Sequence, residues 1–325
     1  MEQTSENLSF RVKKTVELSN KEIDQLVDLV RSTMNEEKTR QNFKDKYLLN
    51  TLGFSFHALM LKNENIVGCN TVIPQEFEYF GKKYLFGQWC ETHIAKDFRG
   101  MFSNFKKLGN ILNEELLKNK ICFIYGLPNR ALYVVSKRLL GMRDIGKLNY
   151  YTYPLSLNKF LRKYYPFNIL LQFLIQIFLK LKFNHREIYN FHINKINNQI
   201  FKQGRYFEKN TYQIEKYENI EYIYKKETSE KHNKAEIVWI IDVSPLNKSN
   251  LEKVVNLIKI SNKKADLIIY IGDLKSIPYN LIKIPDRFID ENNIFSGKIL
   301  NEELIDEKIF NNKNWNINSS NFDYK

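Results

Sequence analysis

The chain has 325 residues, enough for two domains of ordinary size, and it is 43% hydrophobic and 14% aromatic, so it can bury a real core. The net charge of +13 favours acidic partners such as nucleotides, phosphates, anionic lipids or nucleic acid, although an AT-rich genome that places lysine wherever the surface tolerates it would produce the same excess. Cys69, Cys90 and Cys122 lie in apolar runs without CxxC spacing, which excludes a disulfide framework or a zinc site and predicts buried thiols in a reducing compartment.

The first ten residues are polar and contain no apolar stretch of the kind found in signal peptides, so we expect a cytoplasmic protein. In the first half, apolar periodicity predicts strands and amphipathic helices in a fixed order. Strands are expected at 8–18, 54–62, 66–73, 76–80, 84–94, 121–125 and 147–153, and helices at 20–34, 39–49, 101–118 and 131–140. Ser19 can cap the first of these helices, and Gly141 fits the left-handed position after the last. This order predicts an α/β (α+β) fold with a mixed, mostly antiparallel sheet flanked by helices.

The second half begins after Pro154-Leu155, which divides the chain into expected domains 1–155 and 156–325. Helices are predicted at 157–164, 167–181, 184–198 and 251–262, and strands at 222–226, 235–243 and 266–271. The strand–helix–strand order of 235–271 repeats that of 90–125, which indicates a second, degenerate copy of the first domain.

The apolar run 167–179 is shorter than the roughly 20 residues that a membrane-spanning helix needs. Gln172, Gln176 and Lys180 recur at four-residue spacing, so one face of this helix is polar. We therefore expect a docked amphipathic helix and no transmembrane span, and a weak peripheral membrane contact stays open.

Several short motifs follow one another along the chain. They are Phe43-Lys44-Asp45-Lys46-Tyr47 with Asn50, Ile66-Val67-Gly68, Ile73-Pro74, Arg99-Gly100 with Phe102-Ser103, Tyr125-Gly126-Leu127-Pro128-Asn129, Tyr133, Leu140-Gly141, Gly204-Arg205-Tyr206 and Asn314-Trp315. In this order the chain resembles the GNAT superfamily of acyl-CoA-dependent N-acyltransferases. More narrowly, it resembles the two-domain sugar N-acyltransferases that modify amino sugars of bacterial surface polysaccharides. The resemblance covers residues 8–155 well and the remainder thinly.

The resemblance implies a GNAT-type first domain, a second GNAT-like domain with a helical insertion, and acyl-CoA as a co-substrate with no permanently bound cofactor. It also implies a nucleotide-linked acceptor, best matched by a dTDP-linked amino deoxy sugar for lipopolysaccharide or O-antigen biosynthesis. No nucleic-acid partner is expected, and homo-oligomerisation stays open. The alternatives are a FemAB-like transferase that uses aminoacyl-tRNA or a lipid-linked acceptor, and a non-enzymatic basic scaffold.

Two positions depart from the family pattern. The acyl-CoA loop of the superfamily is usually Arg-x-x-Gly-x-Gly, whereas Phe102 and Asn104 stand here where glycines are expected. Lys137 stands where a tyrosine often acts as the acid, so a tyrosine general acid is not carried over to this chain.

The expected donor site lies at the start of the helix predicted at 101–118. Backbone amides of Arg99, Gly100, Met101, Phe102 and Ser103 would bind the CoA phosphates there, because a helix N-terminus favours bound anions. Three further side chains are assigned to the acyl-CoA site, namely Lys106, Asn129 and Tyr133. By resemblance Asn129 contacts the pantetheine or the sulfur, and it equally fits a helix N-cap. The alternative for the turn and its lysines is an ordinary solvated surface.

Glu91 and His93 are two residues apart on one strand, so their side chains face the same side. Either could be the general base, directly or through water, and together with Asn129 they form the expected catalytic set. A route through water without a single essential base stays open, as does a purely structural role for both.

Lys46, Tyr47, Arg205 and Trp315 are the expected substrate-binding residues, with the acceptor site at the junction of the two domains. Ion pairing and core packing are their alternatives. His57, His185, His192 and His232 lack the spacing of metal ligands, so no metal site is predicted.

Overall fold

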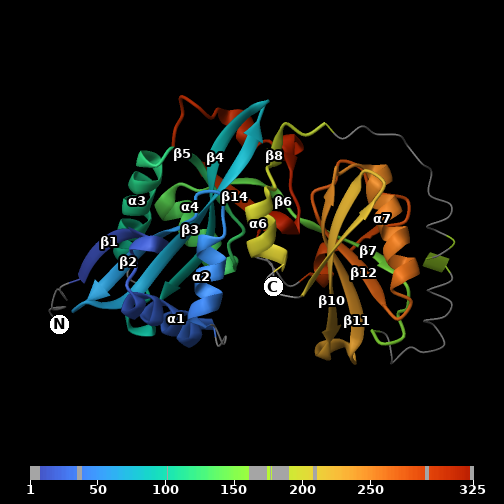
Figure 1. The fold of residues 1–325 in the computed structure, drawn as a ribbon, viewed down its shortest axis with the longest axis horizontal. Helices are drawn as coiled ribbons and strands as arrows, with labels where there is room; N and C mark the ends of the chain where they lie inside the picture. Colours follow the sequence, from blue (N-terminus) through green and yellow to red (C-terminus); the bar gives the residue numbers. More distant parts are fainter. Residues whose placement is uncertain are drawn as a thin grey trace. The chain divides into compact units, whose positions relative to one another are not determined.

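The computed structural model describes residues 8–34, 39–100, 102–160, 174–175, 177, 190–207, 211–289 and 293–322. The chain forms two compact units, each assembled from three stretches (Figure 1). Unit 1 comprises Met1–Gly146, His192–Glu208 and Asn292–Asn312, and unit 2 comprises Lys147–Phe191, Lys209–Glu291 and Lys313–Lys325. The expected ranges 1–155 and 156–325 treat each domain as continuous, whereas the chain returns to unit 1 twice.

Unit 1 is built on a sheet in which the strand order is β1-β2-β3-β4-β5-β14-β6. These strands are β1 (Leu8–Lys14), β2 (Phe56–Lys62), β3 (Asn65–Tyr79), β4 (Lys82–Ile94), β5 (Ile121–Gly126), β14 (Ile294–Ile299) and β6 (Arg143–Lys147), and β8 (Ile193–Lys195) pairs with the end of β3. Strands β1 to β4 are antiparallel neighbours, β4 and β5 are parallel, and β14 is antiparallel to β5. The expected mixed sheet is thereby confirmed.

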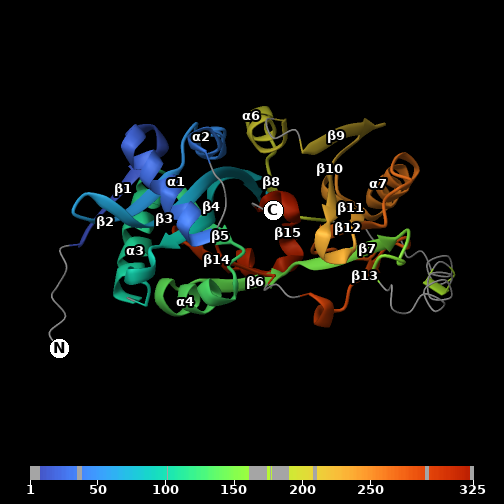
Figure 2. The same cartoon turned by 90° about the horizontal axis from the view of Figure 1, so that it is seen from below.

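Helices cover both faces of this sheet (Figure 2). On one face lie α1 (Asn20–Met34) and α2 (Arg40–Leu48), which bury an apolar cluster that includes Leu26 and Leu59. The opposite face carries α3 (Phe102–Lys118) and α4 (Arg130–Leu140), whose cluster includes Leu112. The short helix α6 (Gln199–Lys202) and the π-helical turn η4 (Gln203–Phe207) follow β8, and α6 lies on the α1–α2 side.

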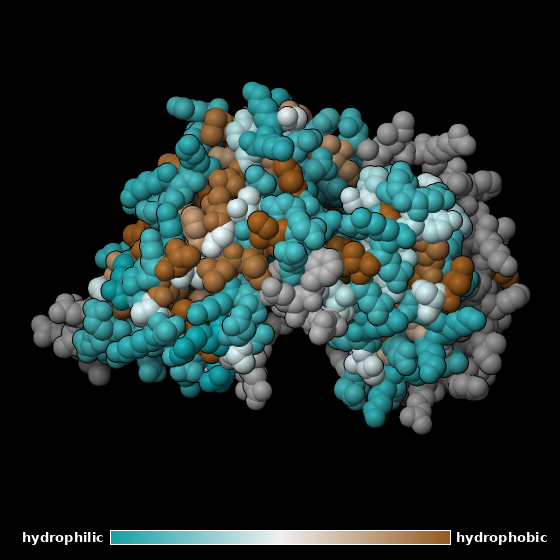
Figure 3. Space-filling view, in the orientation of Figure 1, coloured by the Kyte–Doolittle hydropathy of each residue, from teal (hydrophilic) through white to brown (hydrophobic). Residues whose placement is uncertain are grey.

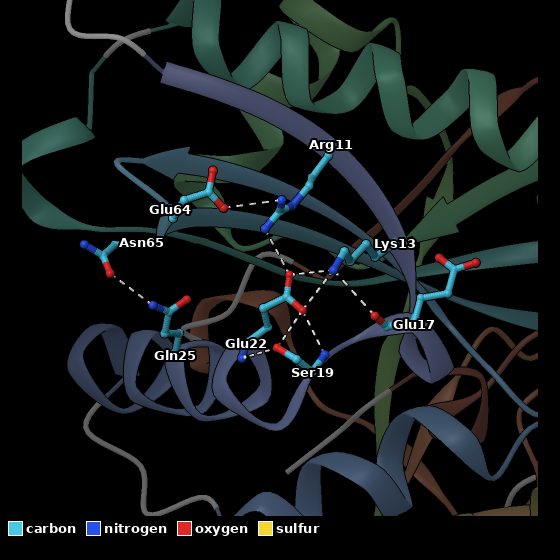
Figure 4. Close-up of polar contacts among 8 residues, drawn as sticks. All are labelled: Arg11, Lys13, Glu17, Ser19, Glu22, Gln25, Glu64 and Asn65. Carbon is cyan, nitrogen blue, oxygen red and sulfur yellow. Dashed lines mark hydrogen bonds and ion pairs between the residues drawn. The ribbon is translucent and has the colours of Figure 1, made fainter.

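A network of charged residues fixes the start of α1 (Figure 4). The backbone N–H of Ser19 donates to Glu22 Oε2 at 2.8 Å, and the N–H of Glu22 donates to Ser19 Oγ at 3.2 Å, which confirms the expected cap. Lys13 Nζ and Arg11 also donate to the Glu22 carboxylate, at 2.8 and 3.0 Å. Burial alone would raise the pKa of Glu22, but the hydrogen bonds from Lys13 and Ser19 lower it to about 2.

Unit 2 contains a sheet in the order β13-β7-β12-β11-β10-β9. Its strands are β7 (Asn149–Pro154), β9 (Tyr212–Tyr217), β10 (Ile220–Ser229), β11 (Ala235–Ser244), β12 (Leu267–Gly272) and β13 (Ile282–Lys283). The helix α7 (Lys248–Ser261) connects β11 to β12, and these two strands are parallel, whereas β9, β10 and β11 are antiparallel neighbours. Since β7 is antiparallel to β12, the arrangement repeats that of β2, β3, β4, α3, β5 and β14 in unit 1.

Short 3-10 helices and one two-residue strand complete the two units. The helices are η1 (Thr15–Glu17), η2 (Lys96–Phe98), η5 (Glu230–His232), η6 (Asp286–Phe288), η7 (Glu307–Phe310), η8 (Asn312–Asn314) and η9 (Ser319–Asn321), and the strand is β15 (Trp315–Asn316). No helix within the described ranges is long and apolar enough to cross a membrane.

Most of the predicted elements have counterparts at nearly the same residues, and Gly141 has the expected left-handed backbone, with φ of 71°. The expected strands 66–73 and 76–80 are one continuous strand, β3. The predicted helix 184–198 is wrong at its end, because residues 193–195 form β8, whose backbone pairs with β3. The helices predicted at 157–164 and 167–181 lie largely outside the described residues. The three cysteines are free thiols, with Cys69 and Cys122 buried and Cys90 half-buried.

Candidate functional site

Strand β5 ends in the middle of the unit 1 sheet, at Gly126, while its parallel neighbour β4 continues. Their parallel pairing runs from Leu85 and Ile121 to Gln88 and Tyr125, where it ends, while β4 continues to Ile94 beside β3. The pairing of β3 with β4 shifts at this point, which leaves Cys90 as the extra residue of a β-bulge. Among the strands that the structure describes, none pairs with β4 beyond Gln88 on its β5 side. Beyond Gln88, β4 therefore has one edge that no described strand covers, with the bulge beside it.

The start of α3 lies after the end of β4. Arg99 donates from Nε to the carbonyl of Ile94 at 2.9 Å, and Gly100 has a φ of +85°, in the left-handed region that favours glycine. Phe102, Ser103 and the side chain of Lys106 are exposed on the first turns of this 17-residue helix. The predicted phosphate-binding residues are thus at a helix N-terminus and open to solvent, except Met101, which lies outside the described residues.

Asn129 caps α4, since its side-chain oxygen accepts a hydrogen bond from the N–H of Leu132 at 2.9 Å. On the next turn, Tyr133 donates to Asp144 at 2.9 Å, and Lys137 contacts both residues, at 3.1 and 2.8 Å. Hydrogen bonds from Lys137 to Asp144 and Tyr133 raise the pKa of Lys137. The N-cap role of Asn129 is therefore realised, and Tyr133 and Lys137 belong to an exposed polar cluster on α4.

The predicted catalytic residues Glu91 and His93 lie on the opposite face of the sheet, beneath α1 and α2, in a buried polar cluster. Lys46 Nζ donates to Glu91 Oε1 at 2.7 Å, and the Tyr47 hydroxyl donates to Glu91 Oε2 at 2.5 Å. The side chains of Lys46 and Glu91 are 13% and 9% exposed, so this is a buried ion pair. The structure thereby brings together four residues that the sequence assigned to two separate roles.

His93 completes this cluster. It is 5% exposed, its Nε2 lies 3.6 Å from Glu91 Oε2, and its Nδ1 lies 2.8 Å from the hydroxyl of Thr33 on α1. Tyr47 of this cluster also belongs to the buried apolar cluster beneath α1 and α2. Apolar side chains gather on the face of unit 1 that Figure 3 shows. Thr33 was not predicted, because its link to His93 joins residues that are far apart in the sequence.

His57, by contrast, is held between two hydroxyls. Its Nε2 lies 2.9 Å from Thr15 Oγ1 and its Nδ1 lies 3.1 Å from Thr71 Oγ1. Burial lowers the pKa of His57 to about 3, with a smaller opposing effect of Glu91. This imidazole is therefore neutral and structural, in agreement with the lack of any assigned role.

A second buried polar group, also missed, lies at the last β4–β5 pair. Gln75 donates to Gln88 Oε1 at 2.8 Å and accepts from the Tyr125 hydroxyl, and all three side chains are buried. Burial raises the pKa of Tyr125 well above its ordinary value, while the positive charge of Arg205 on η4 acts against this effect. Both strands contain several other polar residues, so the sequence does not single out these two glutamines. Arg205 is thus near the point where the pairing of β4 with β5 ends.

In unit 2 the stretch beyond the last β11–β12 pair is covered by the chain itself. Beyond the last β11–β12 pair, the N–H of Asp273 donates to the carbonyl of Ile317 at 3.1 Å, and Ser319 Oγ donates to the carbonyl of Ile241 at 3.1 Å. Asn318 bridges to Gly272 and donates to Asp242 at 2.9 Å. A side chain at Gly272 would come within 2.9 Å of Ile317 O, so only glycine fits there. Residues 317–321 are buried, and Trp315, also in unit 2, is fully buried, so it offers no exposed face for stacking a nucleotide base.

No protein-family model and no curated protein sequence matches the chain. Among solved structures, it is similar to a probable N-acyltransferase from Enterococcus faecalis V583, with 14% identity and a TM-score of 0.56 over 90% of this chain and 73% of that one. A GCN5-related N-acetyltransferase from Anabaena variabilis ATCC 29413 matches with 13% identity and a TM-score of 0.57, over 90% of this chain and 73% of that one. One from Kribbella flavida matches with 8% identity and a TM-score of 0.58, over 90% of this chain and 71% of that one. At these identities the likeness is one of fold, and the chain has the fold of the GCN5-related N-acetyltransferases.

Proposed function

We propose that the protein is an acyl-CoA-dependent N-acyltransferase whose donor site lies in unit 1, where the pairing of β4 with β5 ends beside the bulge at Cys90. The end of this pairing carries the proposal, because an extended thioester arm can lie along the edge of β4 that no described strand covers beyond Gln88. The equivalent stretch of unit 2 is occupied by residues 317–321, so one acyl-CoA would bind per chain.

The phosphates of CoA would bind at the N-terminus of α3. Aligned backbone dipoles favour an anion there, and Arg99 and Lys106 add positive charge. Gly100 allows the backbone to turn into the helix without strain. Phe102 and Ser103 complete the proposed phosphate-binding turn, and Asn129, the N-cap of α4, and Tyr133 on α4 are assigned to the proposed pantetheine side.

The acceptor amine would be deprotonated at the cluster of Glu91 and His93. Each oxygen of Glu91 already accepts a hydrogen bond, from Lys46 or from Tyr47, whereas Nε2 of His93 has no hydrogen-bond partner among the described residues. His93 is therefore the better proton acceptor, and Glu91 would stabilise the imidazolium that forms. Lys46 and Tyr47 would act by holding Glu91.

For the acceptor we propose the amine of a nucleotide-linked amino deoxy sugar, with dTDP as the nucleotide carrier. This choice rests on the order of motifs along the chain. Arg205, on η4 near Tyr125, is the side chain that we propose for the phosphates of the nucleotide, because a guanidinium binds phosphate through paired hydrogen bonds.

Thiol release from a panel of acyl-CoAs, each mixed with amino-sugar nucleotides, tests this function. We expect turnover with at least one pair, and Arg99→Ala should raise the KM for acyl-CoA by about tenfold through loss of a charged phosphate contact. The matched control is Arg138→Ala, which replaces an exposed arginine on α4 and should change neither kcat nor the KM for acyl-CoA. Absence of both turnover and CoA binding over a broad panel would exclude an acyl-CoA enzyme, and transfer from aminoacyl-tRNA instead would favour the FemAB-like alternative.

A further inference from the structure

The two nitrogens of the His93 ring have different neighbours. Nδ1 is within hydrogen-bond distance of Thr33 Oγ1, at 2.8 Å, while Nε2 is buried without a hydrogen-bond partner and points towards Glu91 Oε2 at 3.6 Å. The ring is 5% exposed. The position of the single proton of the neutral ring therefore decides which nitrogen is left to react.

Thr33 determines where that proton lies. Its hydroxyl carries one hydrogen, and its oxygen lies 2.8 Å from the carbonyl of Leu29 and 3.1 Å from that of Val30 on the preceding helical turn. With the hydroxyl hydrogen directed to one of these carbonyls, the oxygen is left to accept a hydrogen bond from His93 Nδ1–H. In the other tautomer the Thr33 hydroxyl would donate to Nδ1, and a buried N–H at Nε2 would face Glu91 Oε2 at 3.6 Å, beyond hydrogen-bond distance.

We infer that Thr33 is a positioning residue that holds neutral His93 with its proton on Nδ1. Nε2 is then free to take the proton that the acceptor amine loses, and this part of the inference rests on the proposed function. In this step the amine nitrogen bonds to the thioester carbonyl carbon, the carbon–sulfur bond breaks, and one proton of the amine moves to Nε2. The new N–H then faces the Glu91 carboxylate. The proton next passes to the departing thiolate, which leaves as the CoA thiol and returns His93 to its neutral form.

The tautomer can be measured without substrate. In proton–nitrogen correlation spectra of the imidazole rings of the full-length protein, protonated and unprotonated ring nitrogens have distinct shifts, and the signals of His93 are those lost in His93→Gln. We expect the Nδ1–H form in the native protein and in Thr33→Ser, which keeps the hydroxyl. Thr33→Val removes the acceptor and should shift the ring towards the Nε2–H form. His57, partnered by Thr15 and Thr71, should not change.

Kinetics then test the catalytic consequence. Thr33→Val should lower kcat by about tenfold or more, while the KM for acyl-CoA changes by less than about twofold, and Thr33→Ser should restore most of kcat. Ser32→Ala is the matched control, because the Ser32 hydroxyl also bonds to the carbonyl of Leu29, at 2.9 Å, but is not among the contacts of His93.

The outcomes separate this inference from the proposed function. A native His93 in the Nε2–H form would overturn the assignment of Thr33 whatever the activity, and so would an unchanged kcat in a folded Thr33→Val variant. A native Nδ1–H form in a protein that transfers no acyl group to any acceptor would support the tautomer assignment and overturn the proposed function.

Discussion

Replacing Lys46 by methionine leaves the carboxylate of Glu91 buried with the Tyr47 hydroxyl and without its cation. The Lys46 and Glu91 side chains are 13% and 9% exposed and 2.7 Å apart, so water cannot compensate for the loss. Removing one partner of such a pair should lower the free energy of unfolding by about 3 kcal/mol. Glu91→Gln should cost about 2 kcal/mol, since the long Lys46 side chain can still reach towards solvent. The double variant should also lose only about 2 kcal/mol, because no uncompensated charge remains.

Urea unfolding of the four proteins, followed by circular dichroism, measures these differences. The control is the ion pair of Arg143 and Glu307, which has the same 2.7 Å separation but is 54% and 71% exposed. Arg143→Met should therefore cost less than about 1 kcal/mol. The account of the buried pair is refuted if Lys46→Met costs no more than Arg143→Met, or if the losses of the two single variants simply add in the double variant.

Three further variants test other parts of the structure. Glu22 has a pKa of about 2 in place of 4.5. Its ionised carboxylate therefore contributes fully to the free energy of unfolding above pH 4.5, and this contribution is lost as the pH falls towards 2. Glu22→Gln should therefore cost about 2 kcal/mol at neutral pH, after allowance for screening, and progressively less in acid, as measured by urea unfolding at several pH values. In Gly100→Ala the added methyl group meets no atom within 4 Å, but the alanine must adopt a φ of +85°. This variant should lower the free energy of unfolding by about 1 kcal/mol. It should also weaken CoA binding in calorimetry, and an unchanged CoA affinity would contradict the proposed phosphate site. A fragment of residues 1–155 lacks β14, the neighbour of β5, and should show no cooperative unfolding transition in urea, whereas a sharp transition would show that β14 is dispensable.

Local signals predicted most of the first unit. Three helix ends were predicted correctly because each depends on residues within one helical turn. They are the α1 cap at Ser19, the N-cap at Asn129 and the left-handed Gly141. The end of the predicted helix 184–198 was wrong because pairing of residues 193–195 with β3 outweighs the helical pattern. The strand β14 was missed for a similar reason, since it is defined by its pairing with the distant β5.

The candidate site was predicted as a set of residues but not as a set of contacts. Lys46, Tyr47, Glu91 and His93 were all named, yet the register of β4 and the placement of α2 decide that they meet in one cluster. Thr33 carries no sequence signal for its contact with His93, because serine and threonine are common on helix surfaces and the contact spans two distant elements.

The interleaved path of the chain has a consequence for its synthesis. The edge of β5 that pairs with β14 is made about 170 residues before its partner, because β5 ends at Gly126 and β14 starts at Ile294. At ordinary translation rates this edge stays unpaired for ~10–30 s. Unit 2 likewise stays incomplete until residues 317–321 emerge. Both units are thus exposed to wrong strand pairing on the ribosome, so slower translation or a higher cellular concentration should favour aggregation of nascent chains.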